Sequence, residues 1–264
     1  MHRLVIFGIT GRMGQSLLRA LAADDGLRLS AAVASAASPS LGKDAVLQGS
    51  PCGIPVTADA AAALADADVA VDFSLPQAVA AHAAACAAAS VPLLVGSTGL
   101  DLATHEALCA AARRIPVLIA PNTSVGVSVM ERLVTTAARA LGADFDTEIL
   151  EAHHRMKRDA PSGTAIALGE AIAAARGATL AELAVFDRHG DIGVRRPQSI
   201  GFSVVRGGDI VGEHTVIFAA DGERIEITHR AGDRMIFARG ALRAAAALVG
   251  RSAGLLRMHD ILGV

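Results

Sequence analysis

LVIFGITGRMG, residues 4–14, decides the fold of this chain. Its first four residues form an apolar run that predicts a short buried strand, and the glycine-rich turn leads into a helix predicted over residues 15–23. A second strand is predicted over residues 28–34. Strand, glycine turn, helix and strand in this order are typical of the opening of a dinucleotide-binding unit.

The three glycines of this turn have separate expected tasks. Gly8 permits the tight turn, Gly11 lets the backbone approach a pyrophosphate, and Gly14 lets the helix pack on the strand. Glycines alone are weak evidence, because a tight strand-to-helix turn needs glycine even without a ligand. The two flanking elements favour the functional interpretation.

Strand–helix pairs continue through the first half of the chain. Strands are predicted over residues 69–73, 92–95 and 116–119, and helices over residues 76–89, 101–113 and up to residue 141. Such repeats predict a parallel sheet with right-handed crossovers, which binds ligands at the carboxyl ends of its strands. Ser74, Thr98 and Asn122 fall at those ends and are expected on one edge, although Ser74 also suits a simple capping role.

A second informative stretch is EILEAHHRMKRDAPSGTA, residues 148–165. Its first five residues alternate as a strand does, and Ser162 is a suitable N-cap for a helix over residues 164–176. The amides of Gly163 and Thr164 would then face outward at the positive end of the helix dipole. This arrangement is a predicted site for a carboxylate or phosphate.

The loop before this helix start is crowded with polar side chains. His153, His154 and Lys157 have no packing purpose there, and Asp159 is expected to pair with one of the neighbouring arginines. A proton donor beside an anion site predicts an enzyme that acts on a small acid.

The rest of the chain predicts a second, α+β lobe. A long polar loop over residues 178–197 leads into strands at 199–205, 210–219 and 223–231, whose alternation and glycine-containing turns predict an antiparallel meander. The apolar helix over residues 235–250 is expected to return to the first lobe.

Composition narrows the function classes. A net charge of -2 gives no electrostatic case for nucleic acid or an anionic membrane, and no apolar run approaches the roughly 18 residues of a membrane helix. Cys52, Cys86 and Cys109 are odd in number and lack metal-site spacing, so we expect no metal and a reducing cytoplasm.

The chain resembles the dihydrodipicolinate reductase family over nearly its whole length. The stretches that carry the resemblance are GITGRMG (8–14), VDFSLP (71–76), VGSTG (95–99), APNTSVGV (120–127), EAHHRMKRDAPSGT (151–164), GGDIVGEH (207–214) and THR (228–230). The segment over residues 151–164 is the most specific of them.

This resemblance agrees with the predicted α/β fold and extends it. It implies a Rossmann-type parallel-sheet domain over residues 1–124, completed by the C-terminal helix of residues 235–264. It also implies a domain over residues 125–234 with a mostly antiparallel sheet, which binds substrate and joins the subunits of a homotetramer. The implied reaction is reduction of 4-hydroxy-tetrahydrodipicolinate, a small dicarboxylate, to tetrahydrodipicolinate by NADH or NADPH, in lysine and diaminopimelate biosynthesis.

Hydride transfer to a conjugated imine leaves negative charge that a nearby acid must quench. The resemblance implies that His153 is the general acid and that Lys157 donates a proton and binds a carboxylate. Expected substrate-binding residues are His154, Ser162, Gly163, Thr164 and Thr98. Expected cofactor-binding residues are Gly8, Gly11, Arg12, Met13, Ser35, Phe73, Gly96, Thr98, Ala120, Asn122, Thr123 and Arg234.

The chain departs from the usual pattern at the ribose position. An acid after the second strand would hold a 2′-hydroxyl, and an arginine there would accept a 2′-phosphate, but residues 34–38 contain neither. Without an acid here, no carboxylate at this position repels the 2′-phosphate of NADPH, and Ser35, Ser38 or Lys43 could contact that phosphate. This favours NADPH or use of both cofactors. Thr123 is a second departure, because many family members place Phe or Met there against the cofactor.

Two other function classes compete with a reductase of this family. One is another two-domain nicotinamide dehydrogenase, but a phosphorylating semialdehyde dehydrogenase would need a nucleophilic Cys in the second lobe, and all three Cys precede residue 110. The other is a non-catalytic regulator that binds NADPH. A regulator would not need the proton donors His153 and Lys157.

Overall fold

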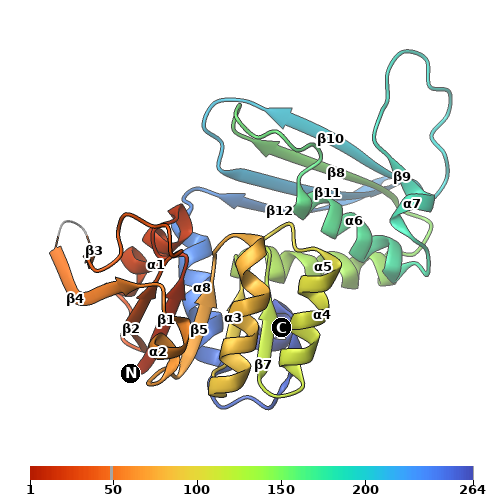
Figure 1. Cartoon of the computed structure of the whole chain (residues 1–264). Helices are drawn as coiled ribbons and strands as arrows, with labels where there is room; N and C mark the ends of the chain where they lie inside the picture. Colours follow the sequence, from red (N-terminus) through yellow and green to blue (C-terminus); the bar gives the residue numbers. More distant parts are fainter. Residues whose placement is uncertain (48–49, 264) are drawn as a thin grey trace. The chain divides into compact units, whose positions relative to one another are not determined.

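The computed structural model describes residues 1–47 and 50–263, and the chain divides into two compact units (Figure 1). The first unit combines Met1–Val125 with Met235–Val264, and the second is Gly126–Arg234. Val264, which the sequence analysis assigns to the first domain, lies outside the described residues. No helix in the described residues is long and apolar enough to cross a membrane.

The first unit is built on one sheet in the order β13-β7-β6-β5-β1-β2-β4-β3. Its strands are β1 (His2–Phe7), β2 (Leu27–Val33), β3 (Asp44–Leu47), β4 (Ser50–Thr57), β5 (Val69–Asp72), β6 (Leu93–Val95), β7 (Pro116–Ile119) and β13 (Gly254–Leu256). Every pair is parallel except β3 with β4. The predicted parallel sheet is therefore confirmed, and β3, β4 and β13 are additional to it.

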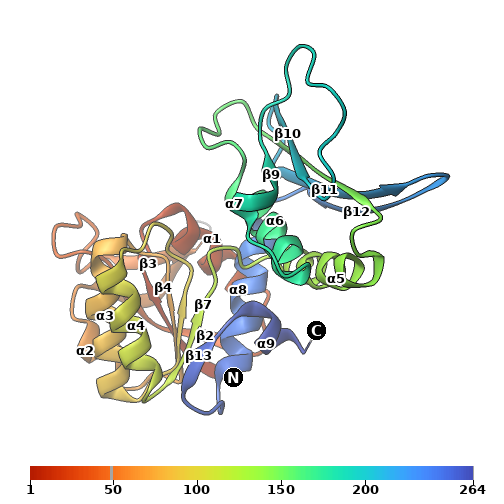
Figure 2. The same cartoon turned by 90° about the vertical axis from the view of Figure 1, so that its right-hand side faces the viewer.

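Helices cover both faces of this sheet (Figure 2). They are α1 (Arg12–Leu21), α2 (Ala60–Leu64), α3 (Pro76–Ala89), α4 (Leu102–Ala112), α8 (Met235–Leu248) and α9 (Met258–Leu262). One face packs on α2, α3 and α4 through residues such as Val5, Val79 and Leu108. The other face packs on α1, α8 and α9 through residues such as Ile6 and Leu17.

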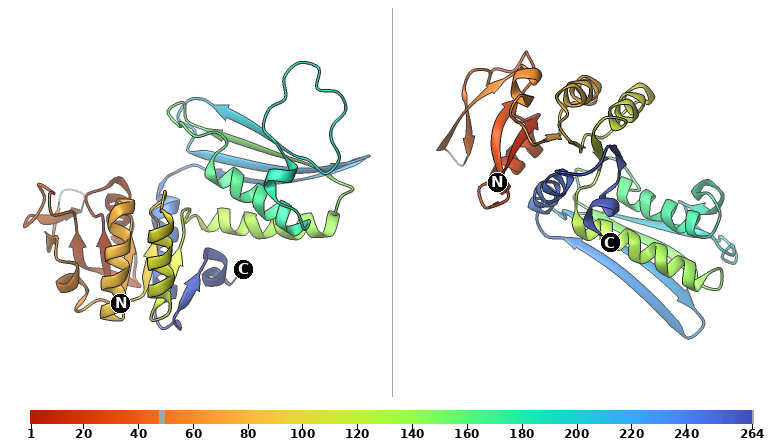
Figure 3. Two further views of the ribbon diagram at one scale, coloured as in Figure 1. Left: turned by 45° about the vertical axis from the view of Figure 1, so that its right-hand side comes forward. Right: turned by 90° about the horizontal axis from the view of Figure 1, so that it is seen from below.

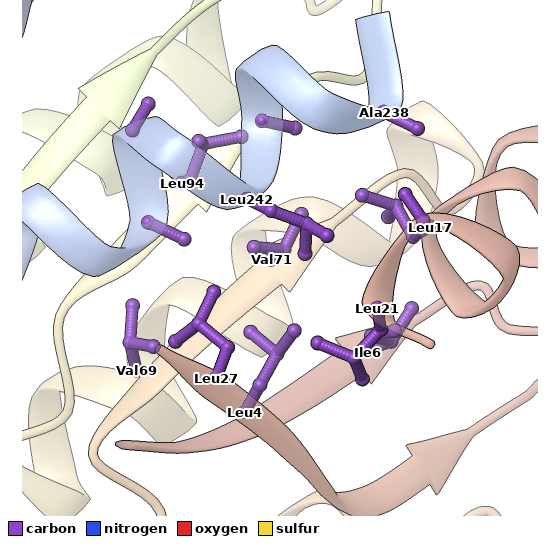
Figure 4. Packing of buried hydrophobic residues seen from close by; sticks show 14 of the residues in the cluster. Leu4, Ile6, Leu17, Leu21, Leu27, Val69, Val71, Leu94, Ala238 and Leu242 are labelled. Atoms are coloured by element: carbon purple, nitrogen blue, oxygen red, sulfur yellow. The ribbon is translucent and has the colours of Figure 1, made fainter. Parts of the chain in front are cut away.

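Helix α8 belongs to the first unit although it follows the second unit in the sequence. Ala238 and Leu242 lie against Val71 and Leu94 of the central strands (Figure 4). Thr123 at the exit from the unit donates its hydroxyl hydrogen to the Phe237 carbonyl at 2.7 Å. The segment where the chain leaves the first unit is thus hydrogen-bonded to α8, the helix where the chain re-enters it.

Truncating Leu242 tests the contribution of α8 to the core. Leu242 is 2% exposed, so Leu242→Ala should lower the free energy of unfolding by about 2–5 kcal/mol, through lost burial and the cavity left behind. Urea denaturation measures the change. Arg243→Ala, an exposed position on the same helix, is the control and should change stability by less than about 0.5 kcal/mol. Equal effects of the two variants would contradict this packing.

The second unit has a five-stranded sheet in the order β12-β11-β8-β10-β9. The strands are β8 (Asp146–His153), β9 (Ala184–Val185), β10 (Ile200–Arg206), β11 (Gly212–Ala220) and β12 (Glu223–Ala231). Helices α5 (Val125–Leu141) and α6 (Gly163–Ala175) lie side by side on one face, and the short α7 (Leu180–Leu183) follows (Figure 3). The core beneath them includes Val134, Ile149, Ile172, Val216 and Phe218.

The predicted three-strand antiparallel meander is wrong in one respect. β11 and β12 form the expected hairpin, but β8 lies between β10 and β11 and pairs in parallel with β10. The turn at Gly207 and Gly208 crosses the end of β8, where the Gly207 amide donates to the His153 carbonyl at 2.9 Å. The predicted loop over residues 178–197 also contains α7 and β9. The sheet remains mostly antiparallel, so the predicted fold class is confirmed.

Candidate active site

The predicted cofactor residues of the first unit lie where its parallel strands end. Amides just beyond the strands bond to the neighbouring strand: Phe73 N donates to Phe7 O at 3.2 Å, Gly96 N to Asp72 O at 2.8 Å, and Ala120 N to Val95 O at 2.9 Å. These bonds align the ends of β1, β5, β6 and β7 along one edge. The same edge carries Gly8, Gly11, Arg12, Met13, Thr98, Asn122 and Thr123.

The glycine turn fits a dinucleotide. Gly8 has a φ of +79°, and a Cβ there would lie 2.7 Å from the Phe73 carbonyl oxygen. A Cβ on Gly14 would lie 2.6 Å from the Ile9 Cα, so the helix start needs glycine to pack on the turn. Gly11 is exposed, and a Cβ there would meet only the Gly8 carbonyl oxygen, at 3.2 Å. The backbone at Gly11 is thus open to a pyrophosphate.

Phe73 is held by its neighbours at the end of β5. A Cβ on Gly96 would lie 2.7 Å from Cδ1 of Phe73, so the ring lies directly against this glycine. The fully buried Asp72 accepts hydrogen bonds from the Ser74 amide at 2.7 Å and from Nδ1 of His82 at 2.8 Å. Sequence reasoning gave no role to His82, which fixes the turn that carries Phe73.

The remaining predicted cofactor residues differ in their exposure. Ser35 and Thr98 are exposed at the edge, whereas Thr123 is 2% exposed and its hydroxyl is bonded to Phe237. Arg234 is exposed and belongs to the second unit. The edge of the first unit therefore brings together all the predicted cofactor residues except Arg234.

The catalytic candidates of the second unit gather at the end of β8. Glu151 and His153 point to the same face of the strand and are 2% and 8% exposed. Nδ1 of His153 lies 2.6 Å from Oε2 of Glu151. Arg206 at the end of β10 makes two bonds of 2.7 Å to the same carboxylate. His153 is thus fixed by an ionic network on two strands.

Ser162 connects this network to helix α6. Its hydroxyl accepts from the Ala165 amide at 3.2 Å, which confirms the predicted N-cap. Its own amide donates to Oε1 of Glu151 at 2.9 Å, and its hydroxyl lies 2.9 Å from Nε2 of His214. Since Ser162 is 2% exposed and bonded in this way, Gly163 and Thr164 are the outer residues of the helix start.

Lys157 lies in the loop between β8 and α6. Its ammonium group is 2.8 Å from Oδ2 of Asp159, so the expected pairing of Asp159 with a neighbouring arginine is wrong. The aspartate instead holds the lysine near the network, and Arg206 donates to the Asp159 carbonyl at 2.6 Å. His154 is half-buried beside His153. In the described residues no group of His, Cys, Asp and Glu is arranged to hold a metal ion.

The network shifts two pKa values. Burial opposes ionisation of Glu151, but hydrogen bonds from Arg206, His153 and the Ser162 amide outweigh it and lower the pKa of this carboxyl. For His153, burial outweighs the favourable bond to Glu151, and the cations Lys157 and Arg206 add to the effect, so its pKa is lowered. The carboxylate is therefore charged and the imidazole tends toward its neutral form.

His214 is the most strongly perturbed histidine of the site. It is 4% exposed, and burial, together with the nearby His153, lowers its pKa to about 4. Its ring meets His153 edge-on with centroids 5.2 Å apart, and its Nδ1 has no hydrogen-bond partner in the described part of the chain. His214 is therefore neutral at working pH and acts on Ser162 as an uncharged ring.

Protonation of His214 should destabilise the fold in mild acid. The unfolded chain binds this proton below a pKa of about 6.5, the folded chain only near 4, so the free energy of unfolding should fall by about 2 kcal/mol between pH 6.5 and pH 4.5. Urea denaturation at several pH values measures the slope. His214→Gln should flatten it. An unchanged slope in that variant would contradict the assignment.

Sequence reasoning missed three members of this network, namely Glu151, Arg206 and His214, as functional partners of His153. Arg206 and His214 lie on β10 and β11, far from His153 in the sequence. The available signal was the alternation of β8, which puts Glu151 and His153 on the face of the buried Ile149. Charged residues on a buried face require partners.

Both halves of the chain match the same protein family. Residues 2–123 match dihydrodipicolinate reductase, N-terminus, and residues 126–262 match dihydrodipicolinate reductase, C-terminus. A 4-hydroxy-tetrahydrodipicolinate reductase from Anaeromyxobacter dehalogenans is 51% identical over 100% of this chain and 98% of its own length. One from Thiobacillus denitrificans is also 51% identical, over 99% of this chain and 98% of its own length.

A solved structure shares the fold. Dipicolinate-bound dihydrodipicolinate reductase from Paenisporosarcina sp. TG-14 superposes with a TM-score of 0.80, at 23% identity and 98% coverage of both chains. At this identity the match supports the architecture of the chain, and the family follows from the sequence matches. The chain belongs to the dihydrodipicolinate reductase family.

Proposed function

We propose that this chain reduces 4-hydroxy-tetrahydrodipicolinate to tetrahydrodipicolinate with NADH or NADPH, in the diaminopimelate and lysine pathway. The observation that carries the proposal is the buried Glu151–His153 pair beside Lys157 and the start of α6. Relatives that are 51% identical over the whole chain bear the name of this reductase, which favours it over another dehydrogenase or a non-catalytic regulator.

The substrate is a dicarboxylate, and the second unit has groups to hold it. The amides of Gly163 and Thr164 and the ammonium group of Lys157 supply the positive charge that a carboxylate needs at a helix start. His154 and Thr98 complete the proposed substrate contacts. The buried Ser162 shapes the helix start through its bonds to Glu151 and His214.

The chemistry is addition of a hydride and a proton to a conjugated imine formed by loss of water. The nicotinamide cofactor supplies the hydride when bound, held by the glycine turn and the strand ends of the first unit. His153 donates the proton from Nε2, because its Nδ1 is engaged by Glu151. Lys157 neutralises a carboxylate and is the second group that could supply this one proton.

We also propose a cytoplasmic homotetramer joined through the sheets of the second unit. The sheet face opposite α5 and α6 carries exposed apolar residues, including Leu150 at 40% and Val205 at 55%, which suits burial against another copy. Light scattering should give four times the 26.8 kDa chain mass. A monomer at working concentration would contradict the proposed assembly.

An assay with both cofactors tests the reaction. The substrate is generated in situ from pyruvate and aspartate semialdehyde by the preceding synthase, and oxidation of NADPH or NADH is followed by absorbance, with a reaction lacking the synthase as the control. We expect turnover with NADPH, and a kcat/KM no lower than with NADH, since no acid follows β2. Cofactor binding without turnover would contradict the proposal and favour the regulator.

A further inference from the structure

The two nitrogens of the His153 ring have different neighbours. Nδ1 lies against the Glu151 carboxylate on the same strand, and Nε2 lies beside Gly212 on the adjacent strand β11. Resting on the proposed function, we propose that these two are positioning residues which together make Nε2 of His153 the proton-donating atom. Glu151 keeps the proton on Nδ1, and the missing side chain at Gly212 leaves Nε2 open to the substrate.

The Glu151 carboxylate is built to accept the Nδ1 proton. Arg206 bonds one nitrogen to each carboxylate oxygen at 2.7 Å, and the Ser162 amide adds a bond of 2.9 Å. A carboxylate held in this way is ionised, rigid and can only accept hydrogen bonds. The 2.6 Å contact with His153 therefore requires a proton on Nδ1, and neutral His153 has none on Nε2.

Gly212 faces the other nitrogen. Glu213 of β11 pairs with Ala152 of β8, so Gly212 follows this register at the end that carries His153. A Cβ on Gly212 would lie 3.1 Å from Nε2 and 3.3 Å from Cδ2 of the His153 ring. Its backbone is not in the left-handed region, so the conformation does not demand glycine. The absent side chain provides space beside Nε2.

This geometry implies that donation from Nε2 requires the imidazolium ion. The charged and titratable groups that face His153 are Glu151 on β8, Arg206 on β10, Lys157 and Asp159 in the loop, and His214 on β11. Glu151 favours the charged ring, but its carboxylate is also bonded to Arg206, and the Asp159 carboxylate is paired with Lys157. A bound dicarboxylate brings the negative charge that shifts the balance toward imidazolium.

The rate should therefore depend on pH in two distinguishable ways. The pKa of His153 is lowered from 6.5 in the free protein, so kcat/KM should fall as the pH rises through a value below 6.5. The corresponding fall in kcat should occur at a higher pH, because the bound substrate stabilises the imidazolium. Coinciding midpoints for kcat and kcat/KM would contradict this part of the inference.

Nuclear magnetic resonance tests the tautomer without any assay of activity. Long-range ¹H–¹⁵N spectra of protein labelled at histidine distinguish Nδ1–H from Nε2–H, and the His153 signals are those lost in His153→Gln. We expect the Nδ1–H form in the neutral protein and a shift toward Nε2–H in Glu151→Gln. An Nε2–H ring in the unsubstituted protein would overturn the inference and leave the proposed reaction untouched.

A double-mutant cycle separates positioning from a purely structural role. Glu151→Gln should lower kcat by about 10²-fold or more with a smaller change in the nicotinamide KM, and Glu151→Asp should recover part of the loss. In the His153→Gln background the same change should cost little further rate. An equal loss in both backgrounds would show that Glu151 acts on the fold, and would overturn its role.

Gly212→Ala probes Nε2 while keeping the Glu151–Arg206 pair. The added methyl group crowds Nε2 and displaces the ring, so kcat should fall by about tenfold or more, since small misplacements of a reacting group are costly. Gly254→Ala is the matched control: Gly254 also begins a strand, is not left-handed and has open space around it. Full activity in Gly212→Ala would overturn the role of Gly212.

Discussion

Replacing His153 with Gln should lower kcat by about 10²-fold or more, the scale on which a positioned general acid contributes. The side chain is 8% exposed and bonded to Glu151, so Gln fills similar space and keeps a hydrogen bond but cannot donate a proton at this site. Steady-state kinetics with the generated substrate measure the loss. Cofactor affinity should stay near that of the unsubstituted protein.

The matched control for this substitution is His105→Gln. His105 is exposed on α4 of the first unit and should leave kcat unchanged. Thermal denaturation of both variants shows whether either loses stability. Near-normal turnover in His153→Gln, with a melting temperature like that of the control, would remove the role assigned to His153.

Lys157→Ala is expected to reduce both rate and substrate affinity. The lysine is paired with Asp159 at the loop surface, and its side chain is 20% exposed, so it can turn to a carboxylate without leaving a buried site. Loss of a charge-assisted contact worth about 1.5–3 kcal/mol should raise the substrate KM by about tenfold or more. The accompanying fall in kcat measures how much Lys157 contributes to proton transfer.

Arg158→Ala provides the comparison for Lys157→Ala. It removes one positive charge from the adjacent exposed position of the same loop, and should change KM by less than about threefold, as for a screened surface charge. Lys157→Ala with an unchanged KM would contradict the carboxylate contact. Equal effects of both variants would indicate that only the net charge of the loop matters.

The first unit was largely predictable because its signals are local. Apolar runs followed by glycine or small polar residues placed β1, β5, β6 and β7, and α3 begins at Pro76 and ends at Ala89 as predicted. The β3–β4 pair was missed because Asp44–Leu47 is short and β4 contains two prolines, which are uncommon inside strands. β13 has three residues and leaves too little pattern to detect.

Strand pairing in the second unit was not predictable from local pattern. Alternation defines the faces of β8, β10 and β11 but not which strand lies beside which. A glycine pair between two strands usually indicates a hairpin, yet Gly207 and Gly208 here lead the chain over the end of β8. The parallel pairing of β8 with β10 buries Ile149 and Phe202 in one core, which is a tertiary effect.

The site was predictable in part for the same reason. His153, Lys157 and the capping Ser162 lie within ten residues of one another, so their chemistry is visible in the sequence. Arg206 and His214 reach the site only through the registers of β10 and β11 with β8. The proton donors His153 and Lys157 could be identified because they are close together in the sequence. The residues that hold them in place could be identified only from the pairing of the strands.

The return of α8 to the first unit has a consequence for synthesis on the ribosome. The sheet face that includes Val71 and Leu94 is covered by Ala238 and Leu242, which are made after the whole second unit. At about 5–20 residues per second, roughly 120 residues of further translation leave this face without its partner for roughly 6–25 seconds. During that time the part of the sheet that α8 later covers is exposed on the nascent chain. Such an apolar surface is a binding target for chaperones that recognise exposed hydrophobic segments.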